Sequence, residues 1–246
     1  MRKLWAAGVA AAATGALLAS TQTASSASVT YPKGYNTWAC GNTSNRVVLT
    51  FDDRPTDHNS PYSYNDTLYW GGYLKSQGIR AMFFFNDNPE WFVKELRKQG
   101  HYVGNHGSSR HPHFSSLTPA QVKKEVDASV KGNMVRPPHG DYNQANKDTL
   151  AKLGYRVCTW HKNLSTHDWD AGSGPRGLRS ADSIRQIIRT GVNKAPGGVV
   201  LGHMWTNFPQ ALPGIVADVH RQGKLFCRNT GPVDPNGYVP FPLKCT

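Results

Sequence analysis

The sequence predicts a single α/β domain built as a distorted (β/α)7-type barrel. Short runs rich in β-branched and aromatic residues recur along the chain, and each is followed by a segment with helical character. This alternation is typical of a parallel sheet covered by helices. The length of 246 residues, 38% of them hydrophobic, supplies one good-sized core rather than two. The 24 Gly and 16 Pro predict many turns and exclude a long coiled coil and a collagen-like rod, and no linker or internal repeat divides the sequence.

Seven strands and six helices are expected. The strand candidates are Arg46–Phe51, Arg80–Phe85, Tyr102–Asn105, Met134–Arg136, Tyr155–Trp160, Gly198–Gly202 and Lys224–Cys227. The helix candidates are Asp66–Gln77, Pro89–Gln99, Pro119–Lys131, Asn143–Leu153, Ala181–Asn193 and Gln210–Gln222. The third helix has the clearest start, because Thr118 is a good N-cap and Gln121 stands at the capping-box position.

The first residues have the layout of a secretory signal peptide. Two basic residues precede an apolar run over 4–18, and a small-residue site follows, which predicts a signal peptide over 1–27. The run is shorter than the roughly 20 residues that a spanning helix needs. We therefore expect a secreted protein, extracellular or cell-wall associated, with no membrane attachment after cleavage.

The charge of the chain is strongly basic. Lys and Arg number 28 against 16 acids, a net charge of +12, although only 18% of residues are charged. The chain lacks a Lys/Arg-rich run and is expected to be exported, so we expect no nucleic-acid partner. The charge instead favours retention near anionic envelopes or polymers.

The four cysteines are consistent with export to an oxidising compartment, because an even number of cysteines in an exported protein usually forms disulfides. Three pairings can form, and a bridge between Cys227 and Cys245 would fix the tail over 228–246. No C-x-x-C spacing occurs, which argues against a thiolate zinc site.

Polar residues follow the predicted strands at their carboxyl ends. Asp52 and Asp53 follow the first strand, His106 follows the third, Arg136 ends the fourth and His203 follows the sixth. In parallel α/β folds the loops at this end converge on one face, where functional side chains gather. These five residues are therefore expected to share one site.

The residue types at this site favour metal chemistry. The run VVLTFDDRP carries two adjacent carboxylates, and the run NHGSSRHPH places His106, His111 and His113 within eight residues. Imidazoles and a carboxylate that leave one coordination position open make a water-activating zinc-type site. Neighbouring acids followed by a histidine cluster suit a metal better than the separated carboxylates of a glycoside hydrolase.

With these motifs the sequence resembles the NodB-like polysaccharide deacetylases of carbohydrate esterase family four. The resemblance covers 46–227, with a segment over 28–45 before it, and rests on TFDDRP, GHYVGNHGSSRHP, RPPHG, a DW pair and a leucine two residues before a histidine. It implies that Asp52 is the general base and that Asp53, His106 and His111 hold the metal, with His113 as the alternative ligand.

The resemblance implies further roles. Arg136 would orient Asp52, and Asp168 would tune His203 as the general acid. Residues in contact with substrate would be Trp169 and Leu201, which line a pocket for the acetyl methyl, and His139, whose backbone N–H would stabilise the oxyanion.

The implied activity is metal-dependent removal of acetyl groups from an N-acetylglucosamine polymer such as chitin or peptidoglycan. The implied cofactor is Zn²⁺, with Co²⁺ as the alternative, and the protein is expected to be a monomer whose partner is an acetylated polysaccharide or oligosaccharide. Two alternatives stay open: an acetylxylan esterase, and a catalytically weakened carbohydrate- or cell-wall-binding module on the same fold.

The sequence departs from the family pattern at four places. His106 and His111 are five residues apart rather than four, so one residue must bulge near Gly107. Arg54 stands where relatives have glycine, His139 replaces an aromatic residue, and Ser165 stands where the fourth motif opens with aspartate.

Overall fold

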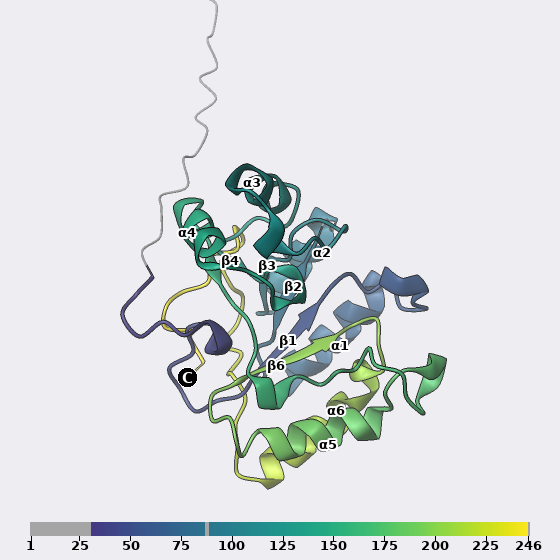
Figure 1. Cartoon of the computed structure of the whole chain (residues 1–246). Coiled ribbons are helices and arrows are strands. Elements are labelled where there is room, and N and C mark those ends of the chain that lie inside the picture. The colour runs from purple at the N-terminus through teal and green to yellow at the C-terminus, as the bar shows by residue number, and fades with distance from the viewer. Residues whose placement is uncertain (1–30, 87–88, 246) are drawn as a thin grey trace, which may run out of the picture.

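The computed structural model describes residues 31–86 and 89–245, so the predicted signal peptide over 1–27 lies outside the described residues. Across these residues, one parallel sheet of six strands runs in the order β5-β4-β3-β2-β1-β6 (Figure 1). The strands are β1 (Val48–Asp52), β2 (Met82–Phe85), β3 (Tyr102–Asn105), β4 (Met134–Val135), β5 (Arg156–Val157) and β6 (Val199–His203).

The predicted fold class is confirmed as a single α/β domain with a curled parallel sheet of the distorted barrel type. The sheet has six strands rather than seven. The seventh candidate, Lys224–Cys227, forms only an isolated parallel bridge between Val47 and Phe226. The Cys227 N–H still donates to the carbonyl of Val47, but the following N–H, that of Arg228, donates to the carbonyl of Cys245 in the tail, so the pairing does not continue.

Helices cover the sheet. They are α1 (Tyr64–Ser76), α2 (Glu90–Lys98), α3 (Pro119–Asp127), α4 (Gln144–Lys152), α5 (Ala181–Gly191) and α6 (Phe208–Arg221). Figure 1 shows α5 and α6 side by side below β6, and α3 and α4 together near β4. The predicted capping box of α3 forms, since Thr118 and Gln121 each bond to the backbone of the other.

The core lies against both faces of the sheet. Every residue of β1 and of β2 is buried, as expected for parallel strands between two layers. Phe51 stacks on Phe83 with ring centroids 5.1 Å apart, and Phe208 of α6 meets Phe51 edge to face. This packing fixes the carboxyl ends of the central strands, where the polar residues begin.

Two disulfides join segments that are distant in the chain. Cys40 pairs with Cys158 and Cys227 pairs with Cys245, which is one of the three pairings that the sequence left open. The first attaches the segment before β1 to the end of β5. Disulfides are typical of proteins that fold in an oxidising compartment.

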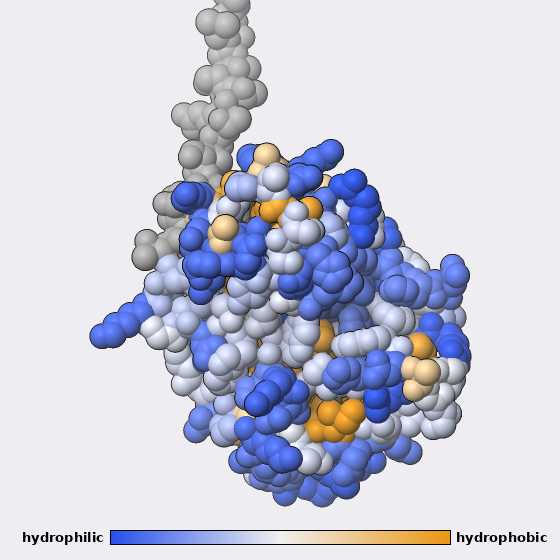
Figure 2. Space-filling view, viewed as in Figure 1, coloured by the Kyte–Doolittle hydropathy of each residue, from blue (hydrophilic) through white to orange (hydrophobic). Residues whose placement is uncertain are grey.

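The visible surface in Figure 2 is mostly hydrophilic, with small separate apolar patches. Within the described ranges, no helix has the length and apolar character needed to cross a bilayer.

Candidate metal and proton-transfer site

A cavity of about 570 Å³ opens at the carboxyl ends of the strands. Eight of the ten predicted site residues line it: Asp52, Asp53, His106, His111, His139, Trp169, Leu201 and His203. The other two, Arg136 and Asp168, are fully buried behind its wall. The sheet therefore brings residues from 52 to 203 into one site.

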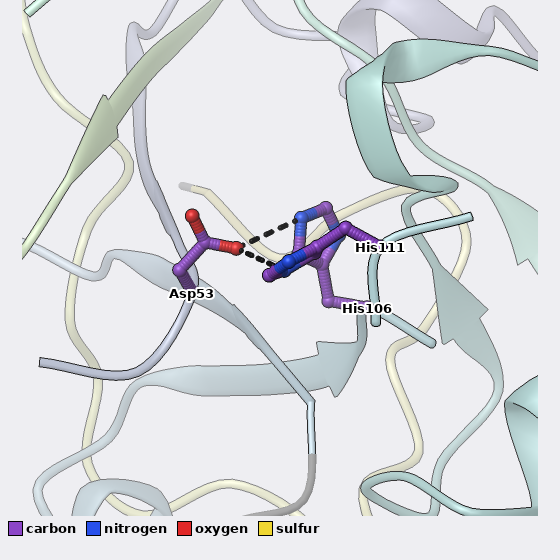
Figure 3. Close-up of side chains that lie close together, drawn as sticks. All are labelled: Asp53, His106 and His111. Carbon is purple, nitrogen blue, oxygen red and sulfur yellow. Dashed lines mark ion pairs between the residues drawn. The ribbon is translucent and has the colours of Figure 1, made fainter. Parts of the chain in front are cut away.

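Asp53, His106 and His111 form the centre of this cavity. Their ligand atoms all lie within 4.8 Å of one another. Asp53 Oδ1 is 2.8 Å from His111 Nε2 and 3.4 Å from His106 Nε2, so one carboxylate oxygen faces both rings (Figure 3). Two imidazole nitrogens and a carboxylate oxygen are a donor set that binds divalent transition metals.

The backbone aims the Asp53 carboxylate into the cavity. Asp53 follows the last residue of β1 and has a φ of 66°, a left-handed conformation that few non-glycine residues adopt. Its N–H donates to the carbonyl of Phe84 on β2. Because the chain turns here, the side chains of both Asp52 and Asp53 reach one cavity, although neighbours in a regular strand point to opposite faces.

The orientation of His106 is set by a backbone group. Its Nδ1 lies 2.7 Å from the carbonyl oxygen of Arg136, so Nδ1 carries the proton and donates it. The lone pair of Nε2 is then directed at Asp53. Metal-binding histidines are commonly fixed in this way by a hydrogen bond from the other ring nitrogen.

The loop after β3 accommodates the five-residue spacing between the two histidines. Gly107 has a φ of 72° and His111 has a φ of 47°, and these two left-handed residues absorb the extra residue predicted near Gly107. His113 does not reach the cluster. It bonds to Asp141 at 3.0 Å and stacks on His139, with ring centroids 4.4 Å apart.

A buried oxygen in this cluster lacks a partner. Among the described residues, Asp53 Oδ1 is buried with no hydrogen bond, while Oδ2 accepts one from Trp205 Nε1 at 3.1 Å. Burial raises the pKa of the Asp53 carboxyl, but the nearby imidazoles of His106 and His111 outweigh burial and hold that pKa well below the usual range. An ionised, unpartnered oxygen that faces two imidazole nitrogens fits a divalent cation.

The neighbouring carboxylate, Asp52, is held by a buried guanidinium. Arg136 Nη1 donates to Asp52 Oδ1 and to Thr50 Oγ1, both at 2.7 Å. Its other nitrogens donate to the carbonyls of Cys158 and Thr159. Asp52 Oδ2 is 3.8 Å from His106 Nε2 and faces the cavity.

On the β6 side, His203 is held by Asp168. The His203 ring donates from Nδ1 to Asp168 Oδ1 at 2.9 Å, and the His203 backbone N–H donates to Oδ2 at 2.8 Å. The hydroxyl of Thr206 also donates to Oδ2. Burial lowers the pKa of His203, but Asp168 and then Asp53 and Asp52 outweigh it and raise that pKa to about 9.

The remaining predicted residues form the cavity walls. The Trp169 ring meets His203 edge to face at 5.1 Å, and Leu201 lies on β6 two residues before that histidine. The His139 ring bonds through Nε2 to the carbonyl of His111 at 3.0 Å. Arg54, at the family's glycine position, forms an ion pair with Asp57 at 2.7 Å.

Sequence reasoning missed two contacts of the cluster. Trp205 is not among the predicted site residues, yet its indole N–H donates to Oδ2 of Asp53. Asn86, which directly follows β2, lies against His111 and is not among the predicted site residues. The sequence did carry a signal for Asn86, because it is a polar residue directly after the apolar run AMFFF at the end of a predicted strand.

Comparisons with known proteins identify a family and several relatives of this chain. The family model described as polysaccharide deacetylase matches residues 41–158. A peptidoglycan-N-acetylglucosamine deacetylase of Bacillus cereus is 26% identical over 212 residues, which cover 79% of this chain and 91% of that protein.

Solved structures share the fold. A family 4 carbohydrate esterase from Streptomyces lividans, in complex with acetate, is 25% identical with a TM-score of 0.59, covering 76% of this chain and 98% of that one. A family pseudoenzyme from Bacillus anthracis is 20% identical with a TM-score of 0.57, covering 75% and 63%. The chain thus belongs to the polysaccharide deacetylase family, carbohydrate esterase family four.

Proposed function

We propose that this chain is a secreted, metal-dependent deacetylase that hydrolyses acetyl groups of an N-acetylglucosamine polymer, peptidoglycan or chitin. The observation that carries the proposal is one cavity holding three groups: a metal-binding triad, a carboxylate fixed by a buried arginine, and a histidine fixed by a buried aspartate. Hydrolysis of an amide needs these three functions: an electrophile, a base and an acid.

Asp53, His106 and His111 would hold the metal, and their donor atoms suit Zn²⁺ or Co²⁺. When bound, the metal supplies Lewis-acid polarisation of the acetyl carbonyl and favours deprotonation of water. The outer oxygen of Asp53 is occupied by Trp205, so the inner oxygen is the one presented to the cavity centre.

Asp52 would act as the general base. Arg136 occupies Oδ1, so Oδ2 is the atom that accepts the proton of the attacking water. The buried guanidinium is held by backbone carbonyls as well, which keeps the carboxylate in one orientation as charge develops.

His203 would act as the general acid. Its Nδ1 is committed to Asp168, which leaves Nε2 facing the cavity as the proton donor to the leaving nitrogen. A pKa of about 9 means that the imidazole carries its proton at neutral pH. An amine leaving group needs such a proton donor, because the leaving nitrogen must be protonated as the C–N bond breaks.

Trp169 and Leu201 would form the wall against the acetyl methyl, and the backbone N–H of His139 would donate to the oxyanion. The basic net charge and the relation to the B. cereus protein support peptidoglycan or chitin over acetylxylan.

A binding module without turnover is the second candidate, because the fold is also that of a B. anthracis pseudoenzyme. Acetate release from chitin oligomers, peptidoglycan and acetylated xylan, measured in parallel with and without chelator, separates the possibilities. We expect release from an N-acetylglucosamine substrate that stops on chelation and returns with Zn²⁺ or Co²⁺. Release that survives complete metal removal would contradict the mechanism, and no release from any substrate would favour the binding module.

A further inference from the structure

Asn86 stands between the strands that carry the metal-binding triad. Strand β2 lies between β1 and β3, and Asn86 directly follows it, just as Asp53 follows β1 and His106 follows β3. The backbone pairs these ends, because the N–H of Asp53 donates to Phe84 and that of His106 donates to Phe85. Three adjacent strand ends therefore place a carboxylate, an amide and an imidazole in one row.

The backbone of Asn86 is fixed from a second side. Ser129 Oγ is 2.8 Å from the carbonyl oxygen of Phe85 and 3.1 Å from that of Asn86. The side chain is completely buried. The position of the amide is thus set by the fold rather than by solvent.

The contacts of this amide are incomplete. Its nitrogen lies 2.7 Å from His111 Nε2, the same atom that lies 2.8 Å from Asp53 Oδ1. Its oxygen is buried and has no hydrogen-bond partner among the described residues. A buried carbonyl oxygen without a partner costs free energy, and such groups usually have a functional reason.

The nitrogen and oxygen of an asparagine amide exchange positions when the group rotates by half a turn. After that rotation, the amide oxygen would lie beside His111 Nε2, the same atom that faces Asp53 Oδ1. A His111 Nε2 that gives its lone pair to a metal cannot also accept a hydrogen bond from the amide nitrogen. Among the described residues, that hydrogen bond is the one contact that favours the present orientation of the amide.

We propose that Asn86 is a fourth protein ligand of the metal, through Oδ1, so that the donor set is Asp53, His106, His111 and Asn86. This inference rests on the metal site of the proposed function and adds a ligand to it. An amide oxygen is neutral, so it strengthens binding without cancelling more of the metal's charge than Asp53 already does. The reacting water or carbonyl would then need a fifth position, which Zn²⁺ and Co²⁺ can accept.

Binding of Co²⁺ alone to the purified protein tests the inference, with affinity measured by titration and ligand number followed by the visible absorption of the bound ion. Asn86→Leu removes the oxygen at similar volume and is expected to weaken Co²⁺ binding about 10- to 100-fold and to change the spectrum. Asn86→Asp is expected to tighten Co²⁺ binding while lowering acetate release per bound metal, because a second carboxylate reduces the charge at the ion.

Asn207→Leu is the matched control. Asn207 is also buried and also has an unpartnered Oδ1 among the described residues, but its nitrogen donates to the carbonyls of Pro175 and Arg179. We expect this variant to bind Co²⁺ with the affinity and spectrum of the unaltered protein.

The outcomes separate the two proposals. Unaltered protein that binds no Co²⁺ would overturn the metal site and with it the proposed function. Unaltered protein that binds Co²⁺, together with an Asn86→Leu variant of equal affinity and spectrum, would overturn only the fourth ligand. Should Asn86→Leu fail to fold by circular dichroism, Asn86→Asp decides: affinity equal to that of the unaltered protein overturns the inference.

Discussion

Strand β3 (Tyr102–Asn105) has a buried histidine at each end, and the two behave in opposite ways. His101, before the strand, has both ring nitrogens engaged by the backbone: the Ala81 N–H donates to Nδ1 at 3.1 Å, and Nε2 donates to the Gly71 carbonyl at 2.8 Å. Burial lowers the pKa of this imidazole to about 4.

His106, after the strand, has only Nδ1 engaged by a backbone carbonyl, and its Nε2 faces Asp52 and Asp53. Burial again lowers its pKa, but the two carboxylates outweigh burial and raise it. Equal burial therefore does not give equal roles. A histidine whose nitrogens are both satisfied by backbone is structural, whereas one with a nitrogen directed at carboxylates is available to bind.

The largest expected effect separates these two histidines. His106→Ala should abolish metal binding and lower acetate release by about 1,000-fold or more, since metal polarisation is worth several kcal/mol. His101→Gln keeps one acceptor and one donor, so it should retain metal binding and activity. Metal content after dialysis and acetate release measure both variants. Comparable metal loss in both would break the comparison.

The two adjacent carboxylates give the next test. Asp52→Asn should lower acetate release about 100- to 10,000-fold, the usual contribution of a general base, while metal content stays unchanged. Asp53→Asn should lose the metal. Metal analysis beside the activity assay decides between them, and equal metal content in both variants would void the assignment of base and ligand.

The smallest effect concerns stability against pH. Below about pH 6.5 the unfolded chain protonates His101, whereas the folded chain does so only near pH 4, so the unfolded state binds more protons in this window. Stability is full above pH 6.5 and falls as the pH drops towards 4, by about 3 kcal/mol for this group.

Urea unfolding of the chelated protein at several pH values, compared with His101→Gln, isolates this contribution. The variant should lose less stability between pH 6.5 and 4 than the unaltered protein does. Parallel pH profiles for the two proteins would mean that His101 does not account for the acid sensitivity.

Much of the site could be predicted because its residues stand at strand ends and in short motifs. Asp53, His106 and His111 were expected as a cluster, and they form one. The start of α3 was likewise readable from Thr118 and Gln121, since a cap involves residues three positions apart.

Contacts between distant segments were not predictable in the same way. The pairing of Cys40 with Cys158 joins residues 118 positions apart, and sequence left three pairings open. The indole of Trp205 on the oxygen of Asp53, and the amide of Asn86 beside His111, depend on which strand lies beside which.

The sequence by itself determined the alternation of strands and helices, the family motifs and the residue types at the carboxyl ends of the strands. These depend on local periodicity and spacing. Only the tertiary structure decided that residues 224–227 form a single bridge instead of a strand, that His113 turns away to Asp141, and that Asn86 lies against His111. Those outcomes depend on strand order and on left-handed loop residues such as His111, because side chains far apart in sequence meet only after the backbone has placed them.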